Sequence, residues 1–211
     1  MYKSYIKRAI DIVLSFIGGM VLLPVFLIVA VAIYIDDPGP VLFKQNRIGK
    51  NKEIFVLHKF RSMRLKTPDI PTHLLSDPDQ YITRVGKVIR KFSLDELPQI
   101  YDILIGKMSI IGPRPALWNQ DDLVEERDKY GANDVRPGLT GLAQISGRDE
   151  LEIPVKAKYD GEYVKKLNEG GWKAFRMDLT CFFGTIMIVL KSDGVVEGGT
   201  GEINKKNEED N

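Results

Sequence analysis

Asp95 and Glu96 are two adjacent acids whose position suits them for chemistry on a phosphate group. Ser93 stands three positions before Glu96, which is the spacing of a capping box at a helix start, although Pro98 favours a start one or two residues later. Both acids then lie near a helix N-terminus, where free N–H groups bind phosphate. Two carboxylates repel a phosphate, so a cation has to lie between the carboxylates and the phosphate. Asp, Mg²⁺ and phosphate form a common arrangement of this kind for phosphoryl transfer. Ordinary helix capping is the alternative explanation.

Arg114 lies between two prolines in the segment Gly112–Pro115. Because the proline rings restrict the backbone, the direction of the guanidinium is set in advance, and a guanidinium so held suits bidentate binding of phosphate. A rigid turn that carries a surface arginine is the simpler explanation.

A third segment, Arg136–Gly141 followed by Ala143–Arg148, combines glycines with polar side chains. Glycine lets a backbone approach a ligand closely, and Gln144 and Arg148 offer hydrogen-bond donors. A loop whose glycines adopt positive φ accounts for the same pattern.

Several common catalytic motifs are absent from the sequence. It contains no P-loop, no dinucleotide-binding glycine motif, no Cys/His cluster with zinc spacing and no nucleophile elbow. Its only histidines are His58 and His73. The three segments above are therefore the candidates for a site.

Composition limits the class of protein. Of the 211 residues, 44% are hydrophobic and 28% charged, which is near the globular average and excludes wholesale disorder. The length allows one domain, or one domain with an anchor. The net charge of +1 hides a basic excess in residues 1–91 and an acidic excess in residues 92–211. The basic half suggests anionic lipid or phosphate as partners, and the single cysteine, Cys181, excludes an internal disulfide.

The segment Ile12–Ile35 contains 24 residues without a charge. As a helix it would be roughly 36 Å long, enough to cross a hydrocarbon core of about 30 Å. A cleaved signal peptide is one interpretation, since Ala30–Ala32 resembles a cleavage site, but the apolar run continues beyond it. A spanning helix is the second interpretation, and a re-entrant helix bent at Pro24 is the third.

Basic residues flank both ends of this apolar segment. Lys3, Lys7 and Arg8 precede it, and Lys44, Arg47, Lys50 and Lys52 follow it. The positive-inside rule depends on an imbalance between the two ends. Since both ends look cytoplasmic here, the charges favour the re-entrant form, in which the chain enters and leaves by one face.

Local patterns predict the remaining elements. A turn at 49–52 separates two apolar runs, 41–43 and 54–57, as in a β-hairpin. Helical spacing over 84–92 predicts an amphipathic helix whose basic face is either solvated or in contact with headgroups. The charged tail 197–211 is predicted to be disordered. Further helices are predicted over residues 97–105, 120–130, part of 153–167 and 179–190. The last of these is either a core helix or a helix in the membrane interface.

Four segments in a fixed order resemble a known family, and they are His58–Met63, Phe92–Gln99, Met108–Pro115 and Arg136–Gly141. The sequence is similar to the bacterial sugar transferases, the monotopic polyprenyl-phosphate phosphoglycosyl transferases. The short length and the single apolar segment resemble the small form that initiates glycan assembly. The resemblance covers residues 3–196.

The resemblance implies an activity and a set of site residues. A UDP-sugar would give its sugar 1-phosphate to undecaprenyl phosphate with release of UMP, initiating assembly of a capsule, exopolysaccharide, O-antigen or glycoprotein. Asp95 would be the nucleophile and a ligand of Mg²⁺, and Glu96 its partner in a catalytic dyad. The side chains expected to bind substrate phosphate are Arg114, Arg90, Lys59, Arg61 and Arg136. Gln144 and Arg148 are expected to bind the donor nucleotide.

The resemblance also implies a fold and a location. We expect a mostly helical α+β protein with a re-entrant membrane helix over 1–36, bent at Pro24, with both ends cytoplasmic. A small catalytic domain over 37–196, with a β-hairpin and interfacial amphipathic helices, would lie on the cytoplasmic face of the bacterial inner membrane. We expect no nucleic-acid partner, and a homodimer is left open.

Two residues depart from the family pattern. Leu23 stands where a small polar residue often precedes the proline, and Leu142 stands where tryptophan usually follows the Gly-Leu-Thr-Gly stretch. Two other functions are open at this point. A non-catalytic, membrane-tethered scaffold would release no nucleotide, and a membrane-bound glycosyltransferase would release UDP.

Overall fold

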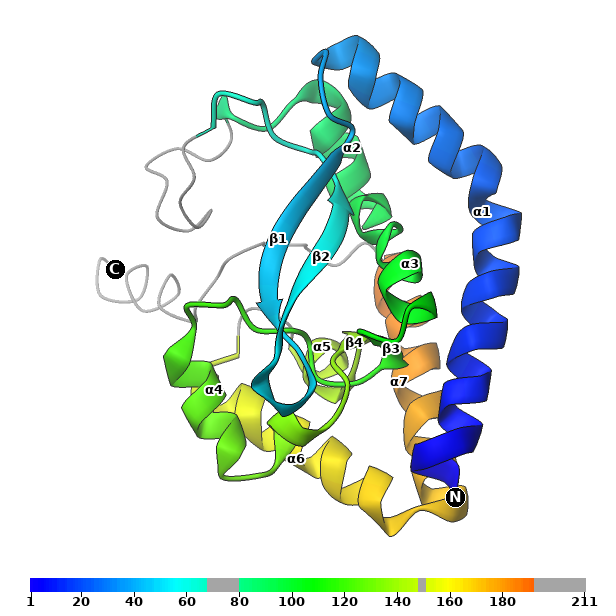
Figure 1. Cartoon of the computed structure of the whole chain (residues 1–211), viewed down its shortest axis with the longest axis vertical. Helices are drawn as coiled ribbons and strands as arrows, with labels where there is room; N and C mark the ends of the chain where they lie inside the picture. Colours follow the sequence, from blue (N-terminus) through cyan, green and yellow to red (C-terminus); the bar gives the residue numbers. More distant parts are fainter. Residues whose placement is uncertain (68–79, 148–150, 192–211) are drawn as a thin grey trace.

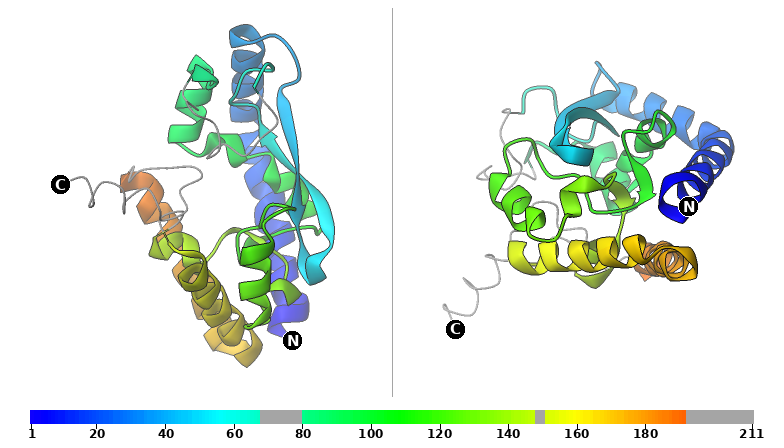
Figure 2. Two further views of the ribbon diagram at one scale, coloured as in Figure 1. Left: turned by 90° about the vertical axis from the view of Figure 1, so that its left-hand side faces the viewer. Right: turned by 60° about the horizontal axis from the view of Figure 1, so that its bottom comes forward.

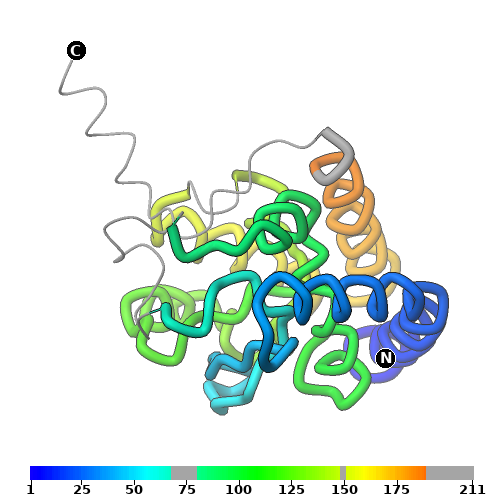
Figure 3. The backbone as a smooth tube through the Cα atoms, turned by 90° about the horizontal axis from the view of Figure 1, so that it is seen from above, coloured from blue at the N-terminus to red at the C-terminus, as the bar shows by residue number. Residues whose placement is uncertain are grey.

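The computed structural model describes residues 1–67, 80–147 and 151–191. Its largest element is α1 (Lys7–Asp36), which continues a π-helical turn, η1 (Tyr2–Ile6). Figure 1 shows α1 along one side of the molecule, with the other elements packed against its inner side. The helix contains Pro24, and its two halves run in different directions when seen from above (Figure 3). A proline inside a helix removes one backbone hydrogen bond, which makes Pro24 the expected position of a bend.

Within the described residues, Tyr2–Asp36 is the one helix long and apolar enough to cross a membrane. Only 11% of its most apolar window is buried, whereas a core helix of a soluble protein is mostly buried. The buried side chains of α1 share one face, and they are Lys7, Asp11, Ser15, Val29 and Ile33. Large apolar side chains such as Phe16 and Val21 are exposed on the rest of the helix. This pattern is consistent with the predicted membrane association.

The predicted β-hairpin is confirmed, with longer strands than expected. Strand β1 (Leu42–Ile48) pairs with β2 (Ile54–Phe60) in antiparallel register, and the short helix η2 (Lys50–Lys52) forms the turn. Every second residue of β2 is buried, which places Phe55, Leu57 and Lys59 on the inner face of the hairpin.

The segment that carries the two adjacent acids follows α2 (Arg84–Lys91), which confirms the predicted amphipathic helix. The acids lie in one 3₁₀ turn, η5 (Leu94–Glu96), before α3 (Gln99–Leu104). The predicted capping box is wrong, because Ser93 has left-handed backbone angles and its side chain caps nothing. Pro98 is the residue before α3, and proline suits a helix start because it has no N–H group to leave unpaired.

A second sheet was not expected from the sequence. Strand β3 (Ser109–Ile111) pairs in parallel with β4 (Gly138–Thr140), where the sequence pattern indicated a loop. A Cβ added to Gly138 would lie 2.1 Å from the backbone nitrogen of Gly112. A Cβ added to Gly141 would lie 2.1 Å from the backbone oxygen of Gly112. Gly141 has an extended φ of −176°. These glycines are therefore required by close backbone contact, not by positive φ.

Five further helices complete the described structure, and they are α4 (Asp121–Asp128), η6 (Ala132–Asp134), α5 (Leu142–Ser146), α6 (Ile153–Glu169) and α7 (Gly171–Lys191). The predicted helices at 120–130 and 153–167 are confirmed by α4 and α6, whereas α7 starts earlier than the predicted 179–190. Figure 2 shows α6 crossing the lower end of the molecule to meet α7 beside the N-terminus. The predicted tail 197–211 lies outside the described residues.

A buried polar cluster ties this lower end together. The Tyr2 hydroxyl and the Lys7 ammonium donate to Asp178 Oδ2 at 2.6 and 3.0 Å. The Tyr163 hydroxyl donates to Asp178 Oδ1 at 2.9 Å. Because Asp178 belongs to α7 and Tyr163 to α6, the start of α1 is fixed to both C-terminal helices. Buried hydrogen bonds to charged groups are among the strongest that proteins make.

Candidate active site

Glu96 is the centre of a three-residue ion cluster. Its Oε1 accepts a hydrogen bond from Lys59 Nζ at 3.1 Å. Arg114 donates to both carboxylate oxygens, from Nη2 to Oε1 at 2.5 Å and from Nη1 to Oε2 at 3.3 Å. The three side chains come from β2, η5 and the loop after β3. A bidentate guanidinium–carboxylate pair fixes both partners in direction as well as distance.

The Glu96 side chain is 15% exposed, and the Lys59 side chain is 11% exposed. Burial by itself would raise the pKa of Glu96, but the charges and hydrogen bonds of Arg114 and Lys59 outweigh it and hold that pKa well below its ordinary range. Glu96 is therefore ionised at neutral pH, and both its oxygens are already engaged by cations. Such a carboxylate is poorly suited to accept a proton, and well suited to hold Arg114 and Lys59 in place.

Asp95, the predicted nucleophile, is 4% exposed. Its neighbours Leu94 and Leu97 pack against an apolar cluster that includes Val29 and Ile33 from the second half of α1. The apolar helix therefore fixes the turn that carries the two acids. Ser93, two residues before Asp95, has φ of 53°, a left-handed conformation that is costly for a residue with a Cβ.

Arg61 and Arg90 lie close to the C-terminal end of α1, the same half of the helix that packs on the turn of Asp95. Arg61 is 6% exposed and donates from Nη2 to the backbone oxygen of Asp37, just after α1 ends. Its Nε and Nη1 have no hydrogen-bond partner among the described residues. Arg90 donates from Nε to Ser62 Oγ at 2.8 Å. Arg61 thus connects the end of α1 with the segment after β2, and Arg90 connects α2 with the same segment.

Arg136 and Gln144 lie elsewhere. Arg136 donates from Nε to the backbone oxygen of Gly106 at 2.9 Å. Since Gly106 follows α3 and Glu96 precedes it, Arg136 lies at the opposite end of that helix from the ion cluster. Gln144 is 9% exposed, and neither its amide oxygen nor its amide nitrogen has a hydrogen-bond partner among the described residues. The predicted donor-binding residue Arg148 lies outside the described residues.

The pair of His58 and Asp102 was not identified from the sequence. Asp102 is fully buried in α3 and accepts a hydrogen bond from the backbone nitrogen of His58 at 2.9 Å. A second hydrogen bond joins its Oδ1 to the ring Nδ1 of His58 at 2.7 Å. Burial raises the pKa of Asp102, against the opposing effect of His58. An acid in the middle of an apolar helix was the available signal. Because His58 precedes Lys59, this pair holds β2 on α3 directly beside the ion cluster.

The donor set around Asp95 is compatible with Mg²⁺. Among the described residues, there is no group of three or more His, Cys, Asp or Glu side chains that could hold a metal ion. Mg²⁺ is commonly bound by one or two carboxylates together with substrate phosphates and water, so it does not require such a group. The carboxylate of Asp95 is the candidate protein ligand, because a carboxylate oxygen is the kind of ligand that Mg²⁺ takes from a protein.

The chain belongs to the bacterial sugar transferase family, whose sequence pattern matches residues 2–192, and this confirms the predicted family. It is 38% identical over 199 residues to UDP-N-acetylgalactosamine-undecaprenyl-phosphate N-acetylgalactosaminephosphotransferase of Aeromonas hydrophila, covering 90% of this chain and 45% of that protein. It is 39% identical over 196 residues to exopolysaccharide production protein PSS of Rhizobium leguminosarum bv. phaseoli, covering 88% of this chain and 95% of that protein.

A third relative is UDP-glucose:undecaprenyl-phosphate glucose-1-phosphate transferase of Escherichia coli K12, which is 38% identical over 168 residues. The match covers 76% of this chain and 36% of that protein. The chain therefore spans less than half of the Aeromonas and Escherichia relatives and nearly all of the Rhizobium relative. In length it resembles the small form of the family.

Proposed function

We propose that this protein transfers a sugar 1-phosphate from a UDP-sugar to undecaprenyl phosphate, releases UMP, and so initiates assembly of a bacterial polysaccharide or glycoconjugate. Membership of the family and the activities named for two relatives support the proposal. The observation that carries it is that the buried Asp95 directly precedes Glu96 in the chain, and that the Glu96 carboxylate holds Arg114 and Lys59 in one cluster. An acid that adjoins an ordered cluster of cations in the chain suits displacement at phosphorus.

The proposed reaction has two displacements at one phosphorus atom. A carboxylate oxygen of Asp95 attacks the phosphate next to the sugar, and the bond from that phosphorus to the oxygen of the departing UMP breaks. The product is an acyl phosphate between Asp95 and the sugar phosphate. An oxygen of undecaprenyl phosphate then attacks the same phosphorus and releases the Asp95 carboxylate. A covalent intermediate divides one difficult transfer into two easier steps.

Arg114 and Lys59 would stabilise the negative charge of the diphosphate during both steps. Glu96 acts as a positioning residue in this proposal, because its two oxygens are occupied by those cations and its pKa is low. Mg²⁺ bound by Asp95 and substrate phosphate would offset further charge and help UMP to leave. Most of the catalysis in phosphoryl transfer comes from positioning and charge stabilisation of this kind.

The proposed enzyme is monotopic, with α1 re-entrant and the domain on the cytoplasmic face of the inner membrane. Two observations support this topology. Lys3 before the apolar segment and Lys50 after it line the same cavity. The hairpin β1–β2 also runs back from the end of α1 towards the N-terminus (Figure 1), with polar residues such as Lys44 and Asn46 exposed on β1. If α1 crossed the membrane as a straight helix, the polar hairpin that runs back towards the N-terminus would lie in the hydrocarbon core.

The decisive experiment is to trap the covalent intermediate. Purified protein is mixed with Mg²⁺ and each of a panel of radiolabelled UDP-sugars without acceptor, and the labelled residue is located by mass spectrometry. We expect label on Asp95 and equimolar UMP. Asp95→Asn should lose both the label and UMP release, whereas Asp122→Asn, at an exposed acid of α4, should retain both. Label on another residue would reject the nucleophile assignment.

The nucleotide product also separates this activity from the two other functions. Release of UDP in place of UMP would indicate a glycosyltransferase, and a scaffold protein would release no nucleotide from any UDP-sugar. Either result, with undecaprenyl phosphate and Mg²⁺ present, would contradict the proposed function. The UDP-sugar that supports the fastest UMP release would identify the donor.

A further inference from the structure

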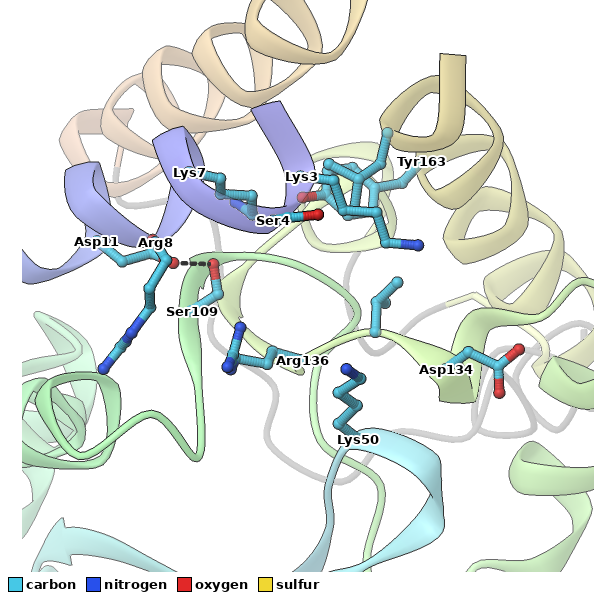
Figure 4. Close-up of a pocket in the computed structure, with 12 residues that line it drawn as sticks. Lys3, Ser4, Lys7, Arg8, Asp11, Lys50, Ser109, Asp134, Arg136 and Tyr163 are labelled. Atoms are coloured by element: carbon cyan, nitrogen blue, oxygen red, sulfur yellow. Dashed lines mark hydrogen bonds between the residues drawn. The ribbon is translucent and has the colours of Figure 1, made fainter. Parts of the chain in front are cut away.

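A cavity of about 250 Å³ lies at the start of α1 (Figure 4), and no member of the Glu96 cluster lines it. Five of its lining residues are cations, and they are Lys3, Lys7, Arg8, Lys50 and Arg136. Its two acids are Asp11 and Asp134. The lining therefore carries an excess of positive charge, contributed by η1, the first turn of α1, the hairpin turn and the segment before β4.

Three of these cations are already engaged within the protein. Lys7 pairs with Asp178 at 3.0 Å, and Lys3 donates to Asn168 at 2.7 Å. Arg8 donates to the backbone oxygens of the last two residues of α3, at 2.6 and 2.8 Å. These contacts give the three side chains structural roles.

Lys50 and Arg136 retain donors that the described part of the chain does not engage. Lys50 is exposed, and its ammonium makes no hydrogen bond or ion pair with a described residue. Arg136 has one described side-chain hydrogen bond, from Nε, so its two terminal nitrogens are available. Figure 4 shows both side chains at the same side of the cavity. The free donors of the cavity are thus concentrated on two residues that are far apart in sequence.

The acids of the cavity do not neutralise this pair. Asp11 accepts hydrogen bonds from Ser109 Oγ at 2.8 Å and from the backbone nitrogen of Ile110 at 3.0 Å. In Figure 4 the Asp134 carboxylate points away from Lys50 and Arg136. Burial, and after it the like charge of Arg136, lowers the pKa of Arg8, so the two guanidinium groups repel each other. An anion in the cavity would relieve this repulsion.

A second, adjoining cavity of about 180 Å³ shares Lys50 and Arg136. It adds Lys107 as a further cation and Glu53 as its acid. Lys50 and Arg136 therefore line both cavities, and both side chains can contact a ligand with one phosphate group. Guanidinium and ammonium donors together are well matched to the oxygens of phosphate.

We propose that Lys50 and Arg136 bind a phosphate group in this cavity, at a site separate from the Glu96 cluster. The Nε of Arg136 donates to the backbone oxygen of Gly106 after α3, whereas Arg114 pairs with Glu96 before α3, and no member of the Glu96 cluster lines the cavity. The cavity opens beside Lys3 and Lys7, where the apolar helix begins. The phosphate can therefore come from the headgroup of an anionic lipid or from a soluble phosphate compound.

The test measures binding of two probes to the full-length protein in detergent by ³¹P NMR titration. The probes are inorganic phosphate and short-chain dihexanoyl-phosphatidylglycerol, with dihexanoyl-phosphatidylcholine as the zwitterionic lipid. Lys50→Ala removes a donor from an exposed turn and leaves the fold intact. Lys52→Ala is the matched control, because Lys52 lies in the same turn, carries the same charge and pairs with Asp128 outside the cavity. Arg136→Lys tests the second donor while keeping its charge.

We expect saturable binding of at least one anionic probe, weakened roughly tenfold by Lys50→Ala and unchanged by Lys52→Ala, as loss of one charge-assisted hydrogen bond requires. Binding of phosphatidylglycerol alone would assign the site to a lipid headgroup, and binding of inorganic phosphate alone would assign it to a soluble phosphate. Absence of binding by both probes, or equal weakening by Lys50→Ala and Lys52→Ala, would overturn the proposal. Asp95→Asn should bind as wild type does, so the result is independent of the proposed catalysis.

Discussion

His58 and Asp102 are joined by two hydrogen bonds, from the ring and from the backbone nitrogen of His58, at 2.7 and 2.9 Å. The first residue precedes Lys59 on β2, and the second lies in α3 directly after the turn that carries Asp95 and Glu96. The pair therefore sets the position of the two segments whose charged side chains meet at the candidate active site. Asp102 itself is fully buried.

Asp102→Leu should destabilise the protein and impair transfer together. The substitution leaves the partly buried backbone N–H of His58 without this acceptor, at a cost of about 1–3 kcal/mol. Asp102→Asn retains an oxygen acceptor, so it should lose less stability and less transfer activity than Asp102→Leu. Chemical denaturation in detergent measures the stability, and UMP release measures activity. Equal stability of Asp102→Leu and wild type would mean that this pair does not hold β2 to α3.

Glu96→Gln should lower the rate of UMP release by about 10²-fold, because Arg114 and Lys59 lose the charge that orders them. The effect should fall mainly on kcat, since a positioning residue acts through the groups it holds. Asp128→Asn breaks an exposed ion pair with Lys52 and serves as the control. We expect the kcat of that variant to be within about twofold of the wild-type value, because surface ion pairs contribute little to stability. An unchanged kcat in Glu96→Gln would remove the ion cluster from the mechanism.

Glu96 also makes stability depend on pH. Its folded-state pKa lies below the unfolded value of about 4.3, so its contribution is present above that pH and is lost as the pH falls towards the folded-state pKa. Asp102, whose folded-state pKa is raised, acts in the opposite direction. We expect the free energy of unfolding to fall less steeply between pH 5 and pH 3 in Glu96→Gln than in wild type, as measured at matched ionic strength.

Gly141→Ala should be strongly destabilising. The new Cβ would lie 2.1 Å from the backbone oxygen of Gly112, and neither backbone can move without separating β3 from β4. Overpacking of this kind costs about 3 kcal/mol. Gly18→Ala is the matched control, since a Cβ added there would have no atom within 4 Å and alanine favours helix. A drop in stability for both variants would indicate a general effect of removing glycine.

The two ends of the apolar segment should be labelled from the same side. Single cysteines at Lys3 and at Lys50 are introduced into a Cys181→Ala background, although Cys181 is buried and should react slowly. In sealed, inside-out membrane vesicles we expect both cysteines to react with a membrane-impermeant maleimide. Reaction of only one of them would show that α1 spans the membrane and would reject the re-entrant topology.

Local sequence signals were sufficient for the elements that local interactions define. The turn between the two apolar runs predicted the hairpin, and the spacing of Val85, Val88 and Ile89 predicted α2. The four separated segments were enough to identify the family. Strands β3 and β4 were not predicted, because each has three residues and pairs only with the other, across a long separation in sequence.

Residue types and their order determined which chemistry the chain can attempt: adjacent acids, an arginine between prolines and a long apolar segment with basic flanks. The tertiary structure alone decided which of these groups meet. It joined Glu96 to Lys59 and Arg114 across 37 and 18 residues, and it moved Arg136 to the other end of α3. Side-chain chemistry is a property of single residues, whereas contacts over such separations depend on how α1, β2 and α3 pack, which no local pattern encodes.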